Sequence, residues 1–161
     1  LQNASGKRVI YGINMSGAGF VQESIYENLN APDFDKATVF AFHSQFPYMF
    51  YAVDNKVYLH NLGTNTTFPM DNIVLGDNEE VTMLKFNLYR QCSLDDLNNQ
   101  SDEFMARQYE LMVGSYNAAT PDNNGGRLGF YPVDGVNNSV TKRTEYSGFA
   151  KIKDVVYRER R

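Results

Sequence analysis

Few side chains in this sequence are of the types that ligate metals or attack substrates. His43 and His60 are the only histidines, and Cys92 is the only cysteine. A zinc site needs three or four ligands that converge on one point, and neither histidine has further ligands at such a spacing. We therefore expect no metal at either histidine, and we expect His43, at the end of a predicted strand, to hydrogen-bond a turn. Cys92 has no motif that links it to a histidine, so a small, partly buried side chain is expected there.

Two polar stretches have a composition that suits calcium, which prefers several carboxylate and carbonyl oxygens. The first stretch contains Asp95, Asp96, Asp102 and Glu103. Its spacing does not match the helix–loop–helix calcium site, and a solvated acidic loop is the simpler interpretation, although a calcium role stays open. The second stretch is Asp122-Asn123-Asn124-Gly125-Gly126, where Asn and Gly more simply provide left-handed turn conformations.

Motifs of common enzymes do not occur. The sequence has no Gly-x-Ser-x-Gly elbow and no phosphate-binding loop with its lysine. A glycosidase needs two carboxylates at a set separation, and no spacing selects such a pair. We therefore predict that the chain is not an enzyme, and we assign no catalytic, cofactor-binding or metal-binding residue.

Charge and hydrophobicity argue against a nucleic-acid-binding protein and against a membrane-spanning one. Lys plus Arg is 15 and Asp plus Glu is 19 in 161 residues, which gives a net charge of -4. Nucleic-acid binding needs clustered cations, so no nucleic-acid partner is expected. The longest apolar run, Tyr48 to Val53, is far too short to cross a bilayer. The chain is therefore expected to hold no transmembrane segment.

Short strands joined by tight turns explain most of the central sequence. Thr38 to His43 and Lys56 to Leu62 alternate with a period of two, and Pro47 to Val53 is a further extended run. Asp54-Asn55 separates two of these runs and is typical of a two-residue hairpin turn. With a short polar strand near residues 66–68, the pattern predicts four strands between Thr38 and Leu75. A turn or two of helix is expected only at 101–106.

The four-strand pattern then repeats. Phe42 aligns with Phe86 at an offset of 44, Met49–Ala52 with Leu111–Gly114 at an offset of 62, and Lys56-Val57 with Arg127-Leu128 at an offset of 71. The second unit therefore has insertions between its strands. The alignment of Phe149–Arg158 with Val81–Arg90, at an offset of 68, predicts the start of a third copy.

A four-strand unit that recurs every 40 to 50 residues or so is typical of a β-propeller blade. We therefore predict an all-β fold, a partial β-propeller of four-stranded antiparallel blades, covering 1–161 and belonging to a longer chain. Its parts are the following: part of a blade at 7–30, whole blades at 37–75 and 81–147, and the start of a next blade or a closing strand at 149–158.

The stretch from Ala41 to Ala52, followed by Asp54 to Thr64, resembles a blade of the WD-repeat kind. That family has a similar hairpin and then Val-x-x-Trp-Asp-Leu. Here His60-Asn61 stands where Trp-Asp is usual, and the chain contains no tryptophan. The resemblance therefore implies a blade, without membership of the WD family.

A closer resemblance is to the C-terminal half of the PKD-like family lipoproteins of Gram-negative anaerobes. It is carried by Lys36–Leu62, Glu79–Phe86 and the ending Gly148–Tyr157, and it covers most of the chain. It implies an exported outer-membrane or cell-surface lipoprotein, an accessory of nutrient uptake. A lipid at a missing N-terminus would be its only membrane anchor.

These interpretations predict a non-catalytic binding module with a glycan, peptide or protein partner. Long loops on a rigid scaffold often carry function, so the insertions at 91–108 and 117–126 are the expected contact surfaces. Most of the abundant aromatic residues are expected to fill the space between blades. Those singled out are Tyr48, Phe50, Tyr51, Tyr58, Tyr116, Phe130 and Tyr131. The alternatives are a fragment of a propeller enzyme acting on glycans and a purely structural module.

Overall fold

The computed structural model describes residues 7–14, 21–26, 29–43, 46–88 and 109–156. Over these residues the protein is all-β, as the strand pattern predicts, with two antiparallel sheets and one separate hairpin. The helical content is two short 3-10 turns, η1 at Phe34–Lys36 and η3 at Pro121–Asn123. The helix predicted at 101–106 lies outside the described residues, as do Cys92 and the acidic stretch from Asp95 to Glu103.

The first sheet, sheet 1, has four strands in chain order: β3 (Val39–Phe42), β4 (Tyr48–Val53), β5 (Lys56–Asn61) and β6 (Thr66–Pro69). Every neighbouring pair is antiparallel. The turn between β4 and β5 is Asp54-Asn55, and Asp54 has a φ of 53°, a left-handed value that Asp and Asn tolerate better than most residues. The four-strand meander predicted for 37–75 is confirmed.

The second sheet, sheet 2, repeats this order with β7 (Glu79–Leu88), β8 (Tyr109–Asn117) and β9 (Gly126–Asp134). Its outer edge is divided between β10 (Ser139–Val140) and β11 (Thr144–Phe149), which pair with successive parts of β9. The fourth strand of the predicted meander is therefore broken into two short strands. Neither sheet closes on itself.

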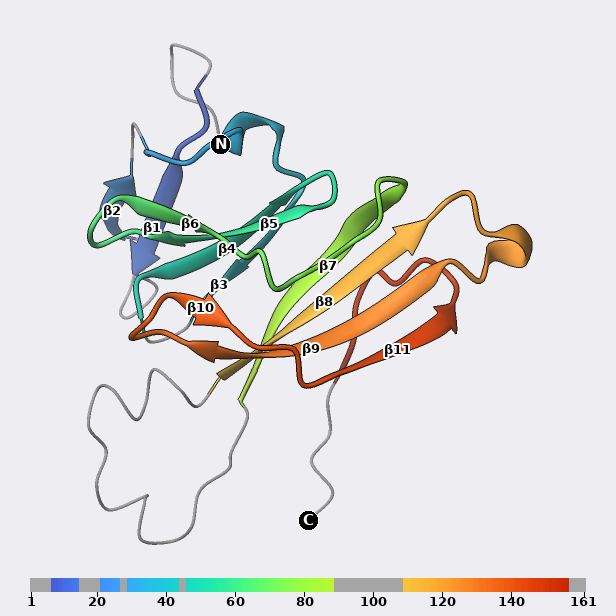
Figure 1. Cartoon of the computed structure of the whole chain (residues 1–161). Coiled ribbons are helices and arrows are strands. Elements are labelled where there is room, and N and C mark those ends of the chain that lie inside the picture. The colour runs from blue at the N-terminus through green and yellow to red at the C-terminus, as the bar shows by residue number, and fades with distance from the viewer. Residues whose placement is uncertain (1–6, 15–20, 27–28, 44–45, 89–108, 157–161) are drawn as a thin grey trace, which may run out of the picture.

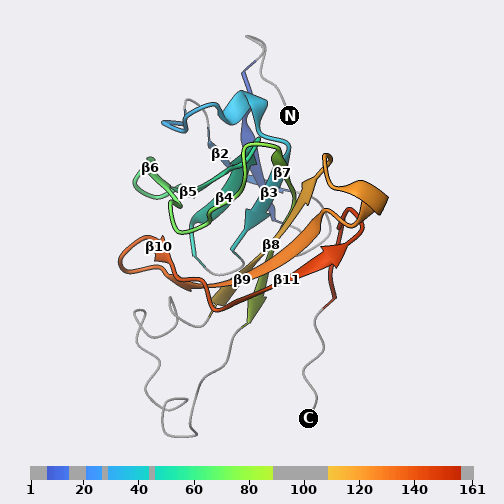
Figure 2. The same ribbon diagram turned by 45° about the vertical axis from the view of Figure 1, so that its right-hand side comes forward.

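A two-stranded hairpin, β1 (Ile10–Asn14) and β2 (Val21–Tyr26), precedes the two sheets. It lies in the part predicted as an incomplete blade at 7–30. Figure 1 shows the hairpin beside sheet 1, on the side away from sheet 2. The view turned by 45° keeps the same sequence of layers (Figure 2).

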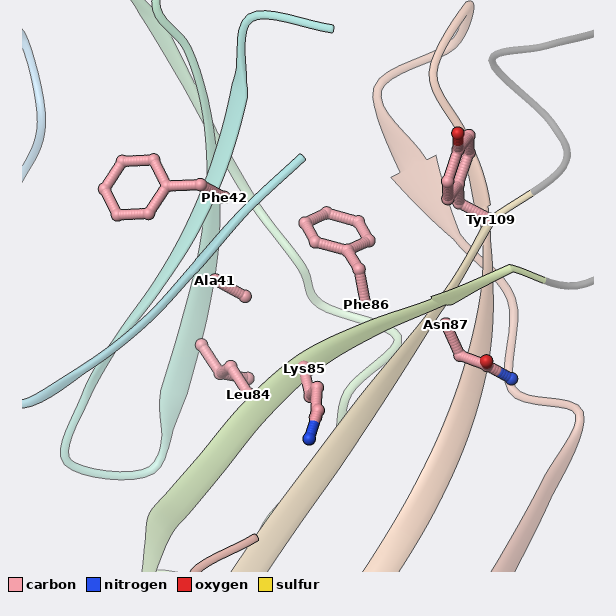
Figure 3. Close-up of a pocket in the computed structure, with 7 residues that line it drawn as sticks. All are labelled: Ala41, Phe42, Leu84, Lys85, Phe86, Asn87 and Tyr109. Carbon is pink, nitrogen blue, oxygen red and sulfur yellow. The ribbon is translucent and has the colours of Figure 1, made fainter. Parts of the chain in front are cut away.

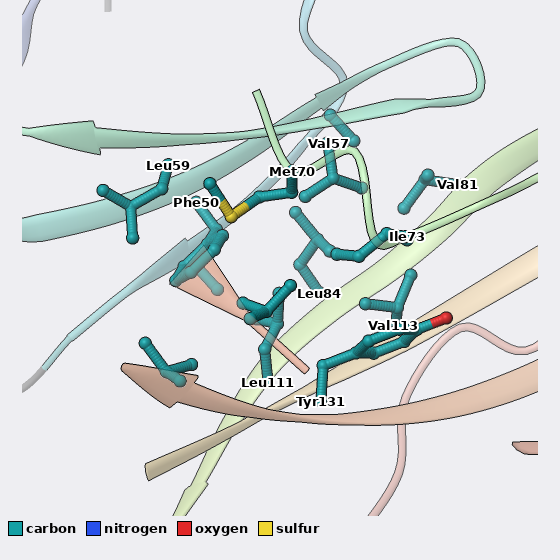
Figure 4. Close-up of a cluster of buried hydrophobic side chains, with 14 residues drawn as sticks. Phe50, Val57, Leu59, Met70, Ile73, Val81, Leu84, Leu111, Val113 and Tyr131 are labelled. Carbon is teal, nitrogen blue, oxygen red and sulfur yellow. The ribbon is translucent and has the colours of Figure 1, made fainter. Parts of the chain in front are cut away.

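The main core lies between the facing sides of the two sheets. Sheet 1 contributes Phe50, Val57 and Leu59, and sheet 2 contributes Leu111 and Tyr131, all of them buried (Figure 4). Burial of large apolar side chains, at about 25 cal/mol per Å² removed from water, is the main force that holds two such sheets together. Four of the seven aromatic residues expected between blades are buried: Phe50, Tyr51, Phe130 and Tyr131.

Each sheet also has an outer face, and the two outer faces are covered differently. The outer face of sheet 1 holds Met49, Tyr51 and Val53. It packs against Phe34 and Ala37 and the partly buried Ile10, Leu29 and Ala31, which we call the N-terminal cover. The outer face of sheet 2 holds a smaller buried cluster. Its four buried members are Met83, Met112, Leu128 and Phe130.

The cover of that second face is the C-terminal strap, which we define as residues 150–156. Ile152 and Val155 of the strap pack on the cluster. The strap forms no strand, because β11 ends at Phe149 and residues 150–156 pair with no neighbour in a sheet. The strand predicted at 149–158 is therefore not formed over 150–156, and residues 157–158 lie outside the described part.

Candidate functional site

A cavity of about 530 Å³ opens at the seam where β3 of sheet 1 and β7 of sheet 2 lie next to one another. We call it the seam pocket (Figure 3). Its lining residues are Ala41, Phe42, Leu84, Lys85, Phe86, Asn87 and Tyr109. In Figure 3, Phe86 and Tyr109 extend to one side of β7, and Lys85 and Asn87 extend to the other. The pocket therefore spans the edge of β7.

Strand register explains why these residues meet. Leu88 pairs with Tyr109 and Asn87 with Glu110, so the end of β7 and the start of β8 lie together at one end of sheet 2. Phe42, the last residue of β3, lies at the same seam and is 51% exposed. Phe42 therefore presents an aromatic surface to solvent at the mouth of the cavity.

Aromatic rings surround His43 next to the pocket. The ring centroid of His43 lies 3.8 Å from that of Tyr109 and 5.0 Å from that of Phe86, both with edge-to-face geometry. The backbone N–H of Phe46 donates a hydrogen bond of 3.0 Å to His43 Nδ1, which confirms the predicted bond between His43 and a turn. Burial lowers the pKa of His43 to about 4. The imidazole is therefore neutral at neutral pH.

Two charged side chains of the described residues beside the pocket, Lys85 and Glu110, are paired. Lys85 Nζ lies 2.7 Å from Asp154 Oδ1 and donates a hydrogen bond of 2.8 Å to the carbonyl oxygen of Val155. Glu110, which pairs with Asn87 in the register, is fully buried and accepts hydrogen bonds of 2.6 and 3.0 Å from the Arg143 guanidinium. The pocket thus offers aromatic surface and one amide, Asn87, to a ligand without net charge.

A second group of charges lies on the part of sheet 2 that is remote from Leu88 and Tyr109 along the strands. Arg127 bridges Glu79 and Glu145, with N···O distances of 2.7 Å to each carboxylate. The hydroxyl of Ser115 donates a further hydrogen bond of 3.2 Å to Glu79. Lys142 Nζ lies 2.9 Å from Glu145, so Arg127 and Lys142 together balance the two carboxylates, and the network stabilises the sheet.

The structure places the two histidines apart in sheet 1. His60 lies on β5, opposite Met49 of β4, and is fully buried. Thr67 donates its hydroxyl proton to the Asn30 carbonyl, so its oxygen accepts from His60 Nδ1–H at 2.8 Å. Burial lowers the pKa of His60. Within the described ranges, no group of three or more His, Cys, Asp or Glu side chains is placed to hold a metal ion.

The predicted contact loops are seen only in part. The insertion at 91–108 lies outside the described residues. In the insertion at 117–126, Asp122 and Asn123 have φ values of 61° and 57°, so the predicted left-handed conformation is confirmed for Asn123 and is adopted by Asp122 as well. The prediction is wrong for Gly125 and Gly126, whose φ values are not in the left-handed region. Over the described residues, no helix is long and apolar enough to span a membrane.

Sequence reasoning did not find the seam pocket, although one signal pointed to it. The alignment of Phe42-His43 with Phe86-Asn87 places the ends of β3 and β7 at equivalent positions, and these ends form the pocket. No protein-family model, curated protein or solved structure matches this chain. The site therefore rests on its own geometry, and the resemblance to PKD-like lipoproteins stays a prediction.

Proposed function

We propose that this chain is a non-catalytic, propeller-like binding module of an exported surface lipoprotein, and that its seam pocket binds a neutral glycan. The observation that supports this proposal is the composition of the pocket. The residues that line it include the aromatic side chains of Phe42, Phe86 and Tyr109 and one amide, Asn87, and two described charged groups beside it, Lys85 and Glu110, are paired.

The propeller-like arrangement is supported by the order and contacts of the strands. Each sheet runs in chain order from its first strand outward, and the first strands, β3 and β7, are neighbours across the seam. Adjacent blades around a propeller channel are arranged in this way. A pocket between two first strands would open toward such a channel.

A neutral glycan suits the pocket better than a charged ligand does. The apolar face of a pyranose ring packs on aromatic side chains, and the amide of Asn87 provides both a donor and an acceptor for hydroxyl groups. The neutral ring of His43 and the ion pair of Lys85 with Asp154 leave little charge to attract an anion or a cation.

The alternative of a propeller enzyme acting on glycans is less well supported. Glycoside hydrolysis needs two carboxyl groups that reach the substrate. Among the described residues, none that lines the pocket is Asp or Glu, and nearby Glu110 is fully buried against Arg143. Binding without cleavage is therefore the function that this geometry favours.

The test is a binding series measured by isothermal titration calorimetry, with cellohexaose, mannohexaose, xylohexaose and maltohexaose as probes. At least one of them should bind, and Phe42→Ala should weaken that binding about fivefold, since an aromatic contact is worth about 1 kcal/mol. Asn87→Ala should weaken it as well. Val74→Ala is the matched control, because Val74 is an exposed apolar residue outside the pocket.

Two results would contradict this function. One is glycan binding that Phe42→Ala leaves unchanged, which would move the site elsewhere. The other is binding of unstructured peptides with no binding of any oligosaccharide. The surface location is tested separately, by protease treatment of intact cells that produce the protein. A chain that resists the protease until the cells are broken contradicts that location.

A further inference from the structure

A cavity of about 220 Å³ is lined by the end of sheet 1 and the edge of sheet 2, and it shares no lining residue with the seam pocket. We call it the edge crevice. One wall is residues 69–72, where the chain leaves β6, and the other is Asn138, Ser139 and Val140, at the start of β10. Asn72 Nδ2 donates a hydrogen bond of 2.8 Å to the carbonyl oxygen of Val140, which ties the two walls together.

One polar atom of these walls is buried without a partner. Among the described residues, Asn138 Oδ1 is shielded from solvent and accepts no hydrogen bond. Asn138 has a φ of 51°, so the left-handed backbone of the turn holds this side chain in place. A buried acceptor that stays unpaired costs free energy, because it has lost its hydrogen bonds to water. A ligand that donates a hydrogen bond to this oxygen removes that cost.

The electrostatic character of the edge crevice is negative. Asp71 is exposed on the first wall, and within the described part of the chain its carboxylate forms no ion pair or hydrogen bond. Asp134, the last residue of β9, adds a carboxylate at the start of the turn that carries Asn138. Lys56 lines a neighbouring cavity that shares Asp71, but no ion pair joins the two side chains. The described residues that line the crevice include no Lys, Arg or His, so it should attract a cation.

The remaining lining is suited to a hydrocarbon chain. Pro69, Met70 and Val140 supply apolar surface, and Ser139 supplies a hydroxyl group. A water molecule occupies about 30 Å³ in the liquid, so a crevice of 220 Å³ has room for roughly seven of them. An alkyl chain of a few carbons with a polar head group fits the same space. The lining therefore matches a ligand with an apolar stem and one positive, hydrogen-donating head.

We propose that the edge crevice binds a primary alkylammonium group, either a lysine side chain of a partner or a free amine. An ammonium has three donors and one positive charge. One donor is directed to Asn138 Oδ1, and the charge lies beside Asp71, while the stem packs on the apolar lining. Calcium fits less well, because its sites generally use several carboxylates and Asp71 is the one carboxylate among the described lining residues. This site goes beyond the proposed glycan binding and does not depend on it.

Titrations of the ¹⁵N-labelled chain, followed by amide chemical shifts, test the proposal. The probes are n-butylamine and a short peptide with a central lysine, and n-butanol is the uncharged analogue. Both amines should shift the amides of Asp71 and Asn138 saturably, whereas n-butanol should not. Tighter binding of the peptide assigns the site to a partner's lysine, and equal or weaker binding of the peptide assigns it to a free amine.

Two variants locate the binding. Asp71→Asn should weaken it at least about fivefold, because it removes the charge beside the ammonium. Asn138→Gly, which tolerates the left-handed φ and removes the amide oxygen, should weaken it about threefold. Asp77→Asn is the matched control, because Asp77 is an exposed carboxylate outside the crevice and the change in net charge is the same. The dispersed amide spectrum of each variant shows that it is folded.

Shifts that do not saturate overturn the proposal, and so does amine binding that Asp71→Asn and Asn138→Gly leave unchanged. Calcium binding that is tighter than that of either amine, and that the same two variants weaken, overturns it as well and assigns the crevice to a divalent cation. None of these results bears on glycan binding, which is read from Phe42→Ala. A failure of this site and a failure of the proposed function are therefore distinguishable.

Discussion

The two sheets each have an apolar outer face, and these two faces are covered by different numbers of residues. The outer face of sheet 1 is covered by the N-terminal cover, in which a buried Phe34 packs on a fully buried Tyr51. The outer face of sheet 2 is covered by the strap, which pairs with no strand. The comparison teaches that one face is buried by contacts between aromatic rings, whereas the other is buried by two partly buried aliphatic side chains, Ile152 and Val155.

Aromatic contacts show why the cover of sheet 1 is the stronger one. Phe34 makes edge-to-face contacts with Phe40 at 5.6 Å and with Tyr51 at 5.5 Å between ring centroids. The Tyr51 hydroxyl donates a hydrogen bond of 2.8 Å to the carbonyl of Pro32. The guanidinium of Arg8 lies over the Phe34 ring and hydrogen-bonds the carbonyl of Phe34 at 3.1 Å. Apolar and polar contacts therefore hold the same segment.

The largest effect on stability is expected from removing the Phe34 ring. Phe34→Ala should lower the free energy of unfolding by about 3 kcal/mol, because it removes a buried ring and leaves a cavity above Tyr51. Ile152→Ala, the equivalent change in the strap, should cost about 1 kcal/mol, because Ile152 is only partly buried. Urea unfolding of both variants measures the difference. Equal losses would show that the two covers are equally strong.

The next effect concerns the buried carboxylate of sheet 2. Glu110→Gln should cost about 2 kcal/mol, because the amide cannot accept both guanidinium hydrogen bonds and Arg143 loses its counter-charge. Arg143 also lies over the Phe130 ring, so the change should loosen the outer face. Glu80→Gln, an exposed carboxylate in the same sheet, is the control. Equal unfolding midpoints for the two variants would contradict a structural role for Glu110.

Acidification should act on sheet 1, where both histidines lie. The pKa of His43 in the folded protein is about 4, below its ordinary value of 6.5, so the unfolded chain binds the proton first as the pH falls. Stability should therefore be complete above pH 6.5 and fall by roughly 2 kcal/mol down to pH 4. Thermal unfolding at pH 7 and pH 5 checks this. His43→Asn keeps an acceptor for the Phe46 N–H and should remove part of the pH dependence, and an unchanged dependence would exclude His43 as its source.

The smallest effect is expected in the strap. Lys151→Ala removes the ion pair with Glu80 and a cation–π contact with Tyr116, which should cost about 0.5 kcal/mol. The loss should shrink in high salt. Lys153→Ala, in the same segment, is the matched control. A loss from Lys151→Ala as large as that from Phe34→Ala would remove the contrast between the two faces.

Local signals predicted more of the fold than of the site. Period-two alternation locates β3 and β5, the Asp54-Asn55 turn separates β4 from β5, and the repeat offsets align strands of sheet 1 with strands of sheet 2. These signals act between neighbours along the chain or between equivalent strands. The ion pair of Glu110 with Arg143 joins residues 33 positions apart, and no local pattern indicates it.

The wrong prediction at 149–158 and the missed seam pocket also concern contacts between distant parts of the chain. Residues 149–158 align with Val81–Arg90 and predict a strand, but residues 150–156 have no neighbouring strand in the structure with which to pair, and alternation alone does not form a sheet. The seam pocket arises where the ends of two strands from different sheets meet. Its shape depends on sheet packing, which the sequence pattern does not specify.

Because Leu88 pairs with Tyr109, the length of the segment between them has little effect on how the sheet folds. The register holds the two ends of residues 89–108 directly opposite each other, so the sheet fixes where that segment leaves and returns. Doubling the length of a flexible connection adds only about 0.6 kcal/mol of closure entropy. Evolution or a protein engineer can therefore exchange this connection, next to Asn87 and Tyr109, and vary recognition while the framework beneath it is inherited unchanged.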